Sequence, residues 1–100
     1  MITSDDTITM DGSAVYYRAP DITLFPSLNI ETGKVTIEAR ARNSDTGADV
    51  GGIVIVVDFA TINAETTTES DPTAMLYEAC EKYVKTELES HNIDAIFTIV

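Results

Sequence analysis

Apolar and polar residues alternate without interruption between Val35 and Arg42. The apolar positions fall on one side of an extended chain and the polar positions on the other: Val35, Ile37, Ala39 and Ala41 against Thr36, Glu38, Arg40 and Arg42. A period of two residues is that of a β-strand, whose successive side chains point to opposite faces. The segment is therefore predicted to be a strand with one buried face and one solvated face.

A helical spacing of three and four residues follows Asp71 and Pro72. Asp favours the N-cap of a helix, and Pro fits the first turn, where its missing N–H would have no partner. The apolar residues that follow share one helical face: Leu76, Ala79, Cys80, Tyr83, Val84 and Leu88. They predict an amphipathic helix over about 72–91. Asn92 is expected to end it in the left-handed conformation, with Leu88 contacting Ile93.

The Asp11-Gly12 pair separates two β-prone runs, residues 7–10 and 13–17. Both central residues of a type I′ turn have positive φ, which Gly and Asp tolerate. These residues predict a β-hairpin over 7–17. Residues 1–6 are polar and acidic, and they are expected to form a loose tail.

Three other segments are strand-like. Residues 22–30 contain Pro26, which has no N–H for a ladder, so this strand is expected at a sheet edge or with a bulge. Residues 53–60 begin apolar on both faces, which is typical of a central strand or of one whose second face is covered by the helix or by a partner. Residues 93–100 predict a final strand.

The order of elements is therefore five strands, one helix and one strand, in a single α+β domain over residues 1–100. We expect an antiparallel or mixed sheet of about five to six strands built from hairpins, with the helix packed on one face. Residues 43–52 and 61–71 are rich in Gly, Asp, Thr and Glu and are expected to be loops.

The chain carries a formal net charge of −11, although 44% of its residues are hydrophobic. The 6 Lys and Arg residues form no cluster, so direct binding to nucleic acid or to an anionic membrane is not expected. The longest apolar run, residues 53–57, is too short to cross a bilayer, and the acidic N-terminus is unlike a secretory signal. We expect synthesis in the cytoplasm and, with Cys80 as the single cysteine, no internal disulfide.

Residues that could carry chemistry are few and isolated. His91, the single histidine, is expected to be exposed at the helix end. Cys80 lies on the apolar helix face near acidic neighbours, which favours an inert thiol. Asp58 is expected at the wet end of its strand. We therefore expect no catalytic residue, no metal, no cofactor and no small-molecule substrate.

Residues 43–49 cluster oxygen-bearing side chains around Gly47, as calcium loops do. The glycine at the sixth position and the glutamate at the twelfth position of such a loop are missing. Turn chemistry explains the same residues and is favoured, while ion binding stays open. If the chain were an enzyme, Asp45, Asp49 and Asp58 would be the first residues to examine.

The strands carry more apolar surface than one helix can cover. The sheet must fold over itself, or a partner subunit must complete the burial. The side chains predicted to form this interaction surface come from three segments: Tyr16, Tyr17, Leu24, Phe25, Leu28, Ile96 and Val100. The partners expected are protein subunits in a homo- or hetero-oligomer.

These features favour a non-catalytic structural or interaction subunit of a larger protein assembly. A small, acidic, Thr-rich domain of hairpins is similar in style to the minor structural proteins of bacteriophage particles, which form tails, necks, baseplates or decorations. That likeness implies assembly into a virion. The alternative is an acidic inhibitor that mimics nucleic acid and blocks a basic surface. The helix offers Glu78, Glu81 and Glu89 for this, but Lys82 and Lys85 interrupt them.

Overall fold

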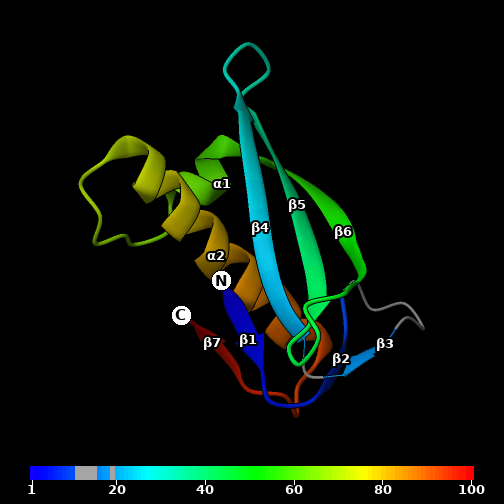
Figure 1. Ribbon diagram of the computed structural model, residues 1–100. Helices are drawn as coiled ribbons and strands as arrows, with labels where there is room; N and C mark the ends of the chain where they lie inside the picture. Colours follow the sequence, from blue (N-terminus) through cyan, green and yellow to red (C-terminus); the bar gives the residue numbers. More distant parts are fainter. Residues whose placement is uncertain (11–15, 19) are drawn as a thin grey trace.

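The computed structural model describes residues 1–10, 16–18 and 20–100, and it has the predicted α+β architecture (Figure 1). A five-stranded antiparallel sheet has the strand order β6-β5-β4-β1-β7. Its strands are β1 (Ile2–Ser4), β4 (Pro20–Asn29), β5 (Lys34–Asn43), β6 (Asp49–Asp58) and β7 (Phe97–Ile99). A second sheet pairs β2 (Thr7–Thr9) with β3 (Tyr16–Arg18), and the helices are α1 (Phe59–Asn63) and α2 (Pro72–His91).

The alternation along β5 is confirmed, and it decides which face of the sheet is buried. Its apolar residues are fully buried beneath α2, and its polar residues point away from the helix. The strand register carries the same pattern across the sheet, because Leu24 of β4 and Ile53 of β6 both lie opposite Ala39. The core is a single layer between α2 and this inner face, with Ile8 and Met10 of the N-terminal segment also buried in it.

Both long hairpins turn by the same device, an Asn followed four residues later by a Gly. Asn29 Oδ1 accepts hydrogen bonds from the N–H groups of Glu31 and Thr32, and Gly33 has φ of 69°. In the second turn, Asn43 Oδ1 accepts hydrogen bonds from the N–H groups of Asp45 and Thr46, and Gly47 has φ of 73°. A Gly is needed at each of these positions, because other residues are strained in the left-handed region. The predicted loop at 43–52 is thus shorter, since β5 continues to residue 43 and β6 starts at residue 49.

The helix α2 begins as predicted. Asp71 Oδ2 accepts a hydrogen bond of 3.0 Å from the Ala74 N–H, and Pro72 occupies the first turn. The C-terminal prediction is wrong, because Asn92 has φ of −137° and is not left-handed. Ile93 is 87% exposed, so it makes no capping contact with Leu88. The side chain of Asn92 is instead committed to hydrogen bonds with the backbone of Thr9.

The predicted loose tail at residues 1–6 is also wrong. β1 lies inside the sheet, where it pairs with β4 on one side and with β7 on the other. Ile2 is completely buried opposite Ile22 and Ile99. Local composition missed this strand because polar neighbours hide its one inward apolar side chain.

Other boundaries differ from the sequence predictions. The expected loop at 61–71 is wrong in its first three residues, and the expected strand at 53–60 in its last two, because a short helix, α1, covers residues 59–63 directly after β6. The last strand starts at Phe97 and not at residue 93. Pro26 lies in an internal strand, yet β1 pairs with β4 only at residues 21 and 22. The half of β4 that contains Pro26 therefore has no neighbour on its second side within the described residues, as expected for an edge.

The pairing of β2 with β3 confirms the N-terminal hairpin, but its register differs from the prediction. A two-residue turn at 11–12 would place residue 14 opposite Thr9, whereas Tyr16 lies there. The Asp11-Gly12 turn itself lies outside the described residues. In that described part, neither helix is both long enough and apolar enough to traverse a lipid bilayer.

Candidate functional site

The outer face of the sheet, which points away from α2, carries large exposed apolar side chains. Phe25 of β4 is 50% exposed, and Val54 and Val56 of β6 are 63% and 62% exposed. Phe25 and Val54 both lie opposite Glu38 of β5, so the three residues form one row across the sheet. Val56 lies in the next row, opposite Thr36. We call Phe25, Val54 and Val56 the outer patch.

The strand that supplies two of these residues lies at the edge of the sheet. The apolar run in β6 predicts a central strand or one whose second face is covered by the helix or by a partner. The central position is wrong, because β6 pairs only with β5 in the described structure, and cover by a partner stays a prediction. Its inward residues Ile53 and Ile55 are half-buried against the core. Its outward valines have no cover in the described part of the chain. The apolar residues of this strand therefore form one partly buried inner face and one exposed outer face.

The structure separates the residues that were predicted to form the interaction surface. Leu24 is 2% exposed and belongs to the core, which corrects its assignment, and Leu28 is partly buried against the core. Phe25 is exposed, as are Ile96 and Val100, but the last two flank β7 at the opposite edge of the sheet from β6. The side chains of Tyr16 and Tyr17 lie outside the described residues. Val54 and Val56 were missed, although the two-faced run at 53–57 was their signal.

Charged residues lie within and beside the outer patch in matched pairs. Arg40 donates to Asp49 Oδ2 at 2.5 Å, and its Nε lies 3.7 Å from Glu38. The Arg40 guanidinium, followed by the Gly51 N–H, lowers the pKa of the Asp49 carboxyl. Asp58 binds Lys34 at 2.5 Å with 62% of its side chain exposed, so its predicted place at the wet end of the strand is confirmed. Because these ion pairs are exposed, they contribute little to the stability of the fold and mainly determine how charge is distributed over this face.

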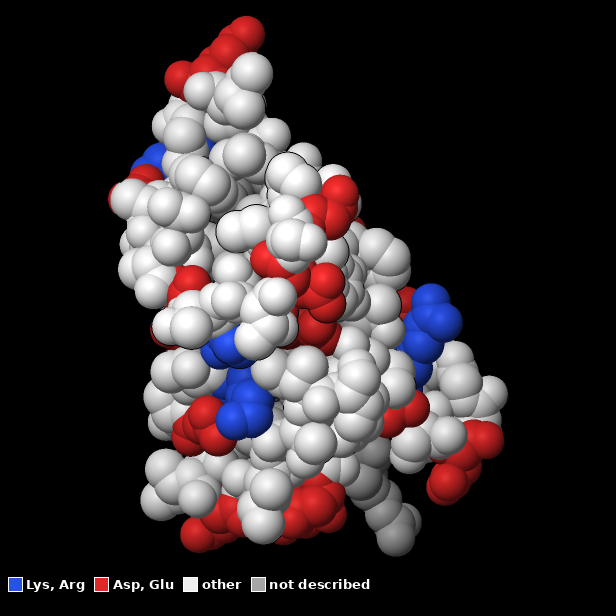
Figure 2. Space-filling model, turned by 90° about the vertical axis from the view of Figure 1, so that its left-hand side faces the viewer, with Lys and Arg blue, Asp and Glu red and all other residues white. Residues whose placement is uncertain are grey.

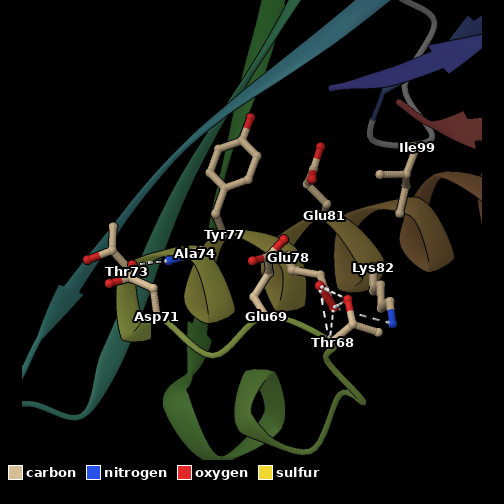
Figure 3. A pocket seen from close by; sticks show the side chains of 10 residues that line it. All are labelled: Thr68, Glu69, Asp71, Thr73, Ala74, Tyr77, Glu78, Glu81, Lys82 and Ile99. Atoms are coloured by element: carbon tan, nitrogen blue, oxygen red, sulfur yellow. Dashed lines mark hydrogen bonds and ion pairs between the residues drawn. The ribbon is translucent and has the colours of Figure 1, made fainter.

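A cavity of about 800 Å³ runs along α2 on the side of β7 (Figure 3). Its lining is strongly acidic, with Glu69, Asp71, Glu78 and Glu81 beside one Lys82. Glu81 is 6% exposed, and the N-terminal ammonium group of Met1 donates to its Oε2. This pairing supplies the buried carboxylate with a cation, which a buried charge needs.

Tyr77 points from α2 toward β4 above this cavity (Figure 3). Burial, followed by the charge of Glu81, raises the pKa of the Tyr77 hydroxyl. A hydrogen bond from the backbone N–H of Leu24 acts in the opposite direction. The phenol is thus held in its neutral form as a bridge between α2 and β4.

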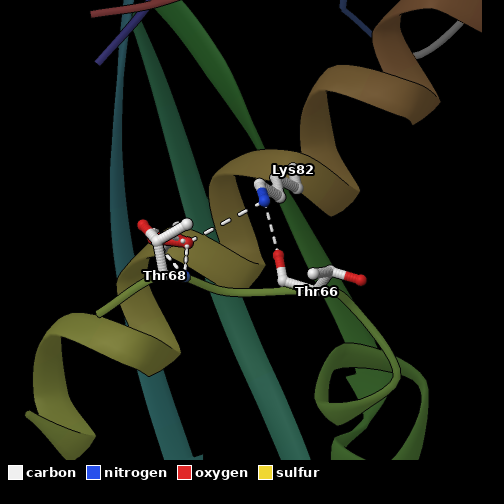
Figure 4. A network of polar contacts seen from close by, with 4 residues as sticks. Thr66, Thr68 and Lys82 are labelled. Atoms are coloured by element: carbon white, nitrogen blue, oxygen red, sulfur yellow. Dashed lines mark hydrogen bonds and ion pairs between the residues drawn. The ribbon is translucent and has the colours of Figure 1, made fainter. Parts of the chain in front are cut away.

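The remaining polar groups of the cavity hold the 64–71 connection onto α2 (Figure 4). The Thr68 N–H donates to Glu78 Oε1 at 2.5 Å, and Lys82 Nζ donates to the carbonyl of Thr66 at 2.5 Å. Glu78 also lies 3.8 Å from Lys82. The Thr68 N–H is the largest influence that lowers the pKa of Glu78. These contacts hold residues 64–71 against α2, and this structural role explains the network.

The residues predicted for chemistry lie apart from one another. Cys80 is fully buried, and burial raises the pKa of its thiol to about 11. His91 is exposed at the end of α2, as predicted. Asn43 and Thr46 accept hydrogen bonds from backbone groups within their own turn, which confirms the turn interpretation of residues 43–49. Among the described residues, no three His, Cys, Asp or Glu side chains are grouped to hold a metal ion.

The outer patch and the β6 edge are therefore two features of the described residues that packing among those residues does not explain. Comparison with protein-family models, with curated proteins and with solved structures finds no significant match for this chain.

Proposed function

We propose that this protein is a non-catalytic interaction subunit that binds other protein subunits through the open side of its sheet. The observation that carries the proposal is the outer patch, in which one aromatic and two β-branched side chains are at least half exposed on one face. Complete burial of each such side chain is worth about 1.5–3 kcal/mol. A surface that forgoes this gain in the free chain is suited to recover it on association.

The composition of the patch supports the same proposal. Aromatic residues and Arg are enriched at the centres of protein interfaces. Phe25 lies one row from Arg40 on this face, because Thr23 is opposite Arg40 and Phe25 is opposite Glu38. Glu38 lies between Phe25 and Val54, and Arg40 lies close enough to offset its charge on this face. The formal charge of −11 limits non-specific association while leaving a specific interface possible.

Within this class, we propose a small structural subunit of a bacteriophage particle, made in the cytoplasm and assembled into the virion. What supports the finer proposal is the style of the whole chain: a short, acidic, Thr-rich domain built from hairpins. Such subunits act by contact with their neighbours, which is the role that an open sheet face suits.

The surface gives less support to an acidic mimic of nucleic acid. A mimic needs carboxylates in an uninterrupted row, whereas acidic groups on the face in Figure 2 are scattered and basic groups lie among them. Along α2, Lys82 pairs with Glu78 and Lys85 pairs with Glu89. In both pairs the lysine offsets the negative charge of the glutamate, which a mimic would need to present to a basic partner.

A photo-cross-linking experiment tests the proposal. Phe25 is replaced by photoreactive benzoylphenylalanine, and the full chain is irradiated in the cells that naturally make it. The matched control carries the same group at Ile93, which is apolar and 87% exposed but lies outside the sheet. We expect position 25 to cross-link one protein, identified by mass spectrometry, at least tenfold more strongly than position 93.

A Phe25→Asp variant provides the second arm. It should abolish co-purification of the cross-linked protein without changing the circular dichroism spectrum, because Phe25 is half exposed and contributes little to the core. Equal cross-linking from positions 25 and 93, or co-purification unaffected by Phe25→Asp, would refute the proposed function.

A further inference from the structure

We propose that the free edge of β6 pairs antiparallel with β6 of a second copy of this chain, with the two-fold axis at Ile55. The two five-stranded sheets then form one continuous sheet. This inference deepens the proposed function by naming one partner, and it rests on that function.

Apart from the bulge at Val50, the described β6 edge lacks the features that normally prevent pairing. Exposed edges are protected by short length, by Lys or Pro, or by inward charges. β7 at the other edge is 3 residues long, and the unpaired half of β4 contains Pro26. β6 is 10 residues long, and residues 50–57 contain no charge and no proline. Within the described residues, the β7 edge and the unpaired half of β4 are thus protected, while the β6 edge is open.

The backbone geometry identifies which groups face the open edge. The Phe59 N–H donates to the carbonyl of Gly33 at 2.8 Å, so this pair begins the hydrogen-bonded positions of the β5–β6 ladder. Such pairs alternate along antiparallel strands. Residues 53, 55 and 57 therefore direct their N–H and C=O groups toward β5. Residues 52, 54, 56 and 58 direct theirs to the open edge.

The limits of the regular strand select one register. The ladder is irregular at Ala41 and Arg42, which lie opposite Gly51 and Asp49, so Val50 is bulged out of the pairing. Bulges bend a strand away from a flat edge. The regular run is thus 51–58, and Ile55 is the midpoint of its edge-facing residues, 52, 54, 56 and 58. With the two-fold axis at Ile55, Val54 lies opposite Val56 of the second copy. Both residues direct their N–H and C=O groups to the open edge, so these groups can form hydrogen bonds between the two strands.

This register also matches side chains on the outer face. The Val54 and Val56 side chains of both copies form one apolar cluster. Asp58 of the second copy falls opposite Gly52, which has no side chain and lies next to Arg40 on β5. The arginine can therefore reach across the glycine toward the carboxylate of the other copy. Shifting the register by two residues would place Gly52 opposite Val56 and lose this match.

The inner side of the edge has room for the contact. A hollow of about 330 Å³ opens between β6 and the C-terminal half of α2, lined by Ile53, Ile55, Met10 and Leu88 among others. At the two-fold axis, Ile55 of each copy enters the space beside this hollow. Apolar groups thus become buried on both faces of the joined sheet.

Net charge gives the association a distinctive salt dependence. Two copies of charge −11 repel each other, and salt screens that repulsion. Pairing through backbone and valine contacts should therefore strengthen between about 0.05 M and 0.5 M salt, as the screening length shrinks. Association driven by attraction to a basic partner would weaken over the same range.

Cysteine cross-linking tests the register directly. In the proposed dimer the two Ile55 Cα atoms are about 4.5 Å apart, as in a non-hydrogen-bonded pair, which fits a disulfide. The two Val54 residues are diagonal neighbours about 7–8 Å apart, beyond disulfide reach. Under mild oxidation Ile55→Cys should form a covalent dimer, while Val54→Cys and the wild type, with its buried Cys80, should stay monomeric on a non-reducing gel.

A proline variant separates pairing from folding. Val56→Pro removes an N–H that faces the open edge, so the monomer should keep its circular dichroism spectrum and urea midpoint while sedimentation shows at least tenfold weaker dimerisation. Val57→Pro removes an N–H that bonds β5 and should unfold the chain. Phe25→Lys, which changes the same face away from the edge, should dimerise like the wild type.

Three outcomes would overturn this inference: a wild type that stays monomeric at high concentration and high salt, cross-linking of Val54→Cys in place of Ile55→Cys, or a Val56→Pro protein that dimerises normally. None of them affects a cross-link from position 25 to a different protein. The proposed function would then stand without self-pairing.

Discussion

The side-chain amide of Asn92 bonds both backbone groups of Thr9, although the two residues are 83 positions apart. Asn92 Oδ1 accepts from the Thr9 N–H at 2.8 Å, and Nδ2 donates to the Thr9 carbonyl at 2.8 Å. Nδ2 also donates to the carbonyl of Leu88 at 2.8 Å, near the end of α2. The amide of Asn92 thus forms the hydrogen bonds with Thr9 that a neighbouring strand would otherwise supply, and it links β2 to α2.

Substitution of Asn92 tests this link. Asn92→Asp keeps the acceptor but loses both donated hydrogen bonds, and we expect a loss of about 2 kcal/mol in the free energy of unfolding. Asn92→Gly should be at least as destabilising, because φ of −137° gives glycine no advantage. Urea unfolding with a constant m-value measures both. A stable Asn92→Gly protein would favour a left-handed helix cap and contradict the observed geometry.

Ile2 should be a structural residue despite its place near the chain end. Ile2→Ala removes a fully buried side chain from the middle of the sheet, and we expect a loss of about 2–5 kcal/mol. The matched control is Ile93→Ala at an 87% exposed position, which should change stability by less than about 0.5 kcal/mol. Thermal unfolding of both variants makes the comparison. Equal stabilities would mean that residues 1–6 are a tail after all.

Acid should release the 64–71 connection from α2. The pKa of Glu78 is lowered in the folded protein, chiefly by the Thr68 N–H, so the ionised form is the one that the fold binds. Its contribution is complete above the pKa of an unfolded glutamate and is lost as the pH falls through the lower folded value. Amide hydrogen exchange at Thr68 should therefore accelerate in acid beyond its intrinsic pH dependence.

Glu78→Gln is the control for that experiment. It removes the titrating group, so the extra acceleration at Thr68 should vanish and protection there should be weaker at neutral pH. Protection that stays the same in the variant would show that other contacts hold the connection.

The Cys80 thiol should be inert in the native state. Burial raises its pKa to about 11, so the thiolate is scarce at neutral pH and reagents have no access. We expect no alkylation by iodoacetamide in native buffer and complete alkylation in denaturant, measured by intact mass. Rapid native labelling would indicate that α2 opens from the sheet.

The raised pKa of the Cys80 thiol also predicts that stability falls as the pH rises above the pKa of an unfolded thiol, because only the unfolded chain then loses the proton.

Elements with a strong local pattern were predicted correctly. The helix over 72–91 follows from the cap at Asp71, from Pro72 and from the stripe that ends at Leu88, and all of these are local signals. The strand from Val35 follows from a period of two residues. The candidate site was predicted only in part: Phe25 is exposed, but Leu24 beside it is buried, because the pleat sends neighbours to opposite faces.

The sequence by itself determined the long helix, the strand from Val35 with its inward face, and the wet position of Asp58, because periodicity and capping act between residues near in the chain. Only the tertiary structure decided that β1 lies inside the sheet, that β6 is an edge and that Asn92 binds Thr9. Those arrangements depend on pairings between distant segments, whose register no local pattern encodes. The outer patch exists for the same reason, since the apolar run of β6 is exposed or buried according to which strands lie beside it.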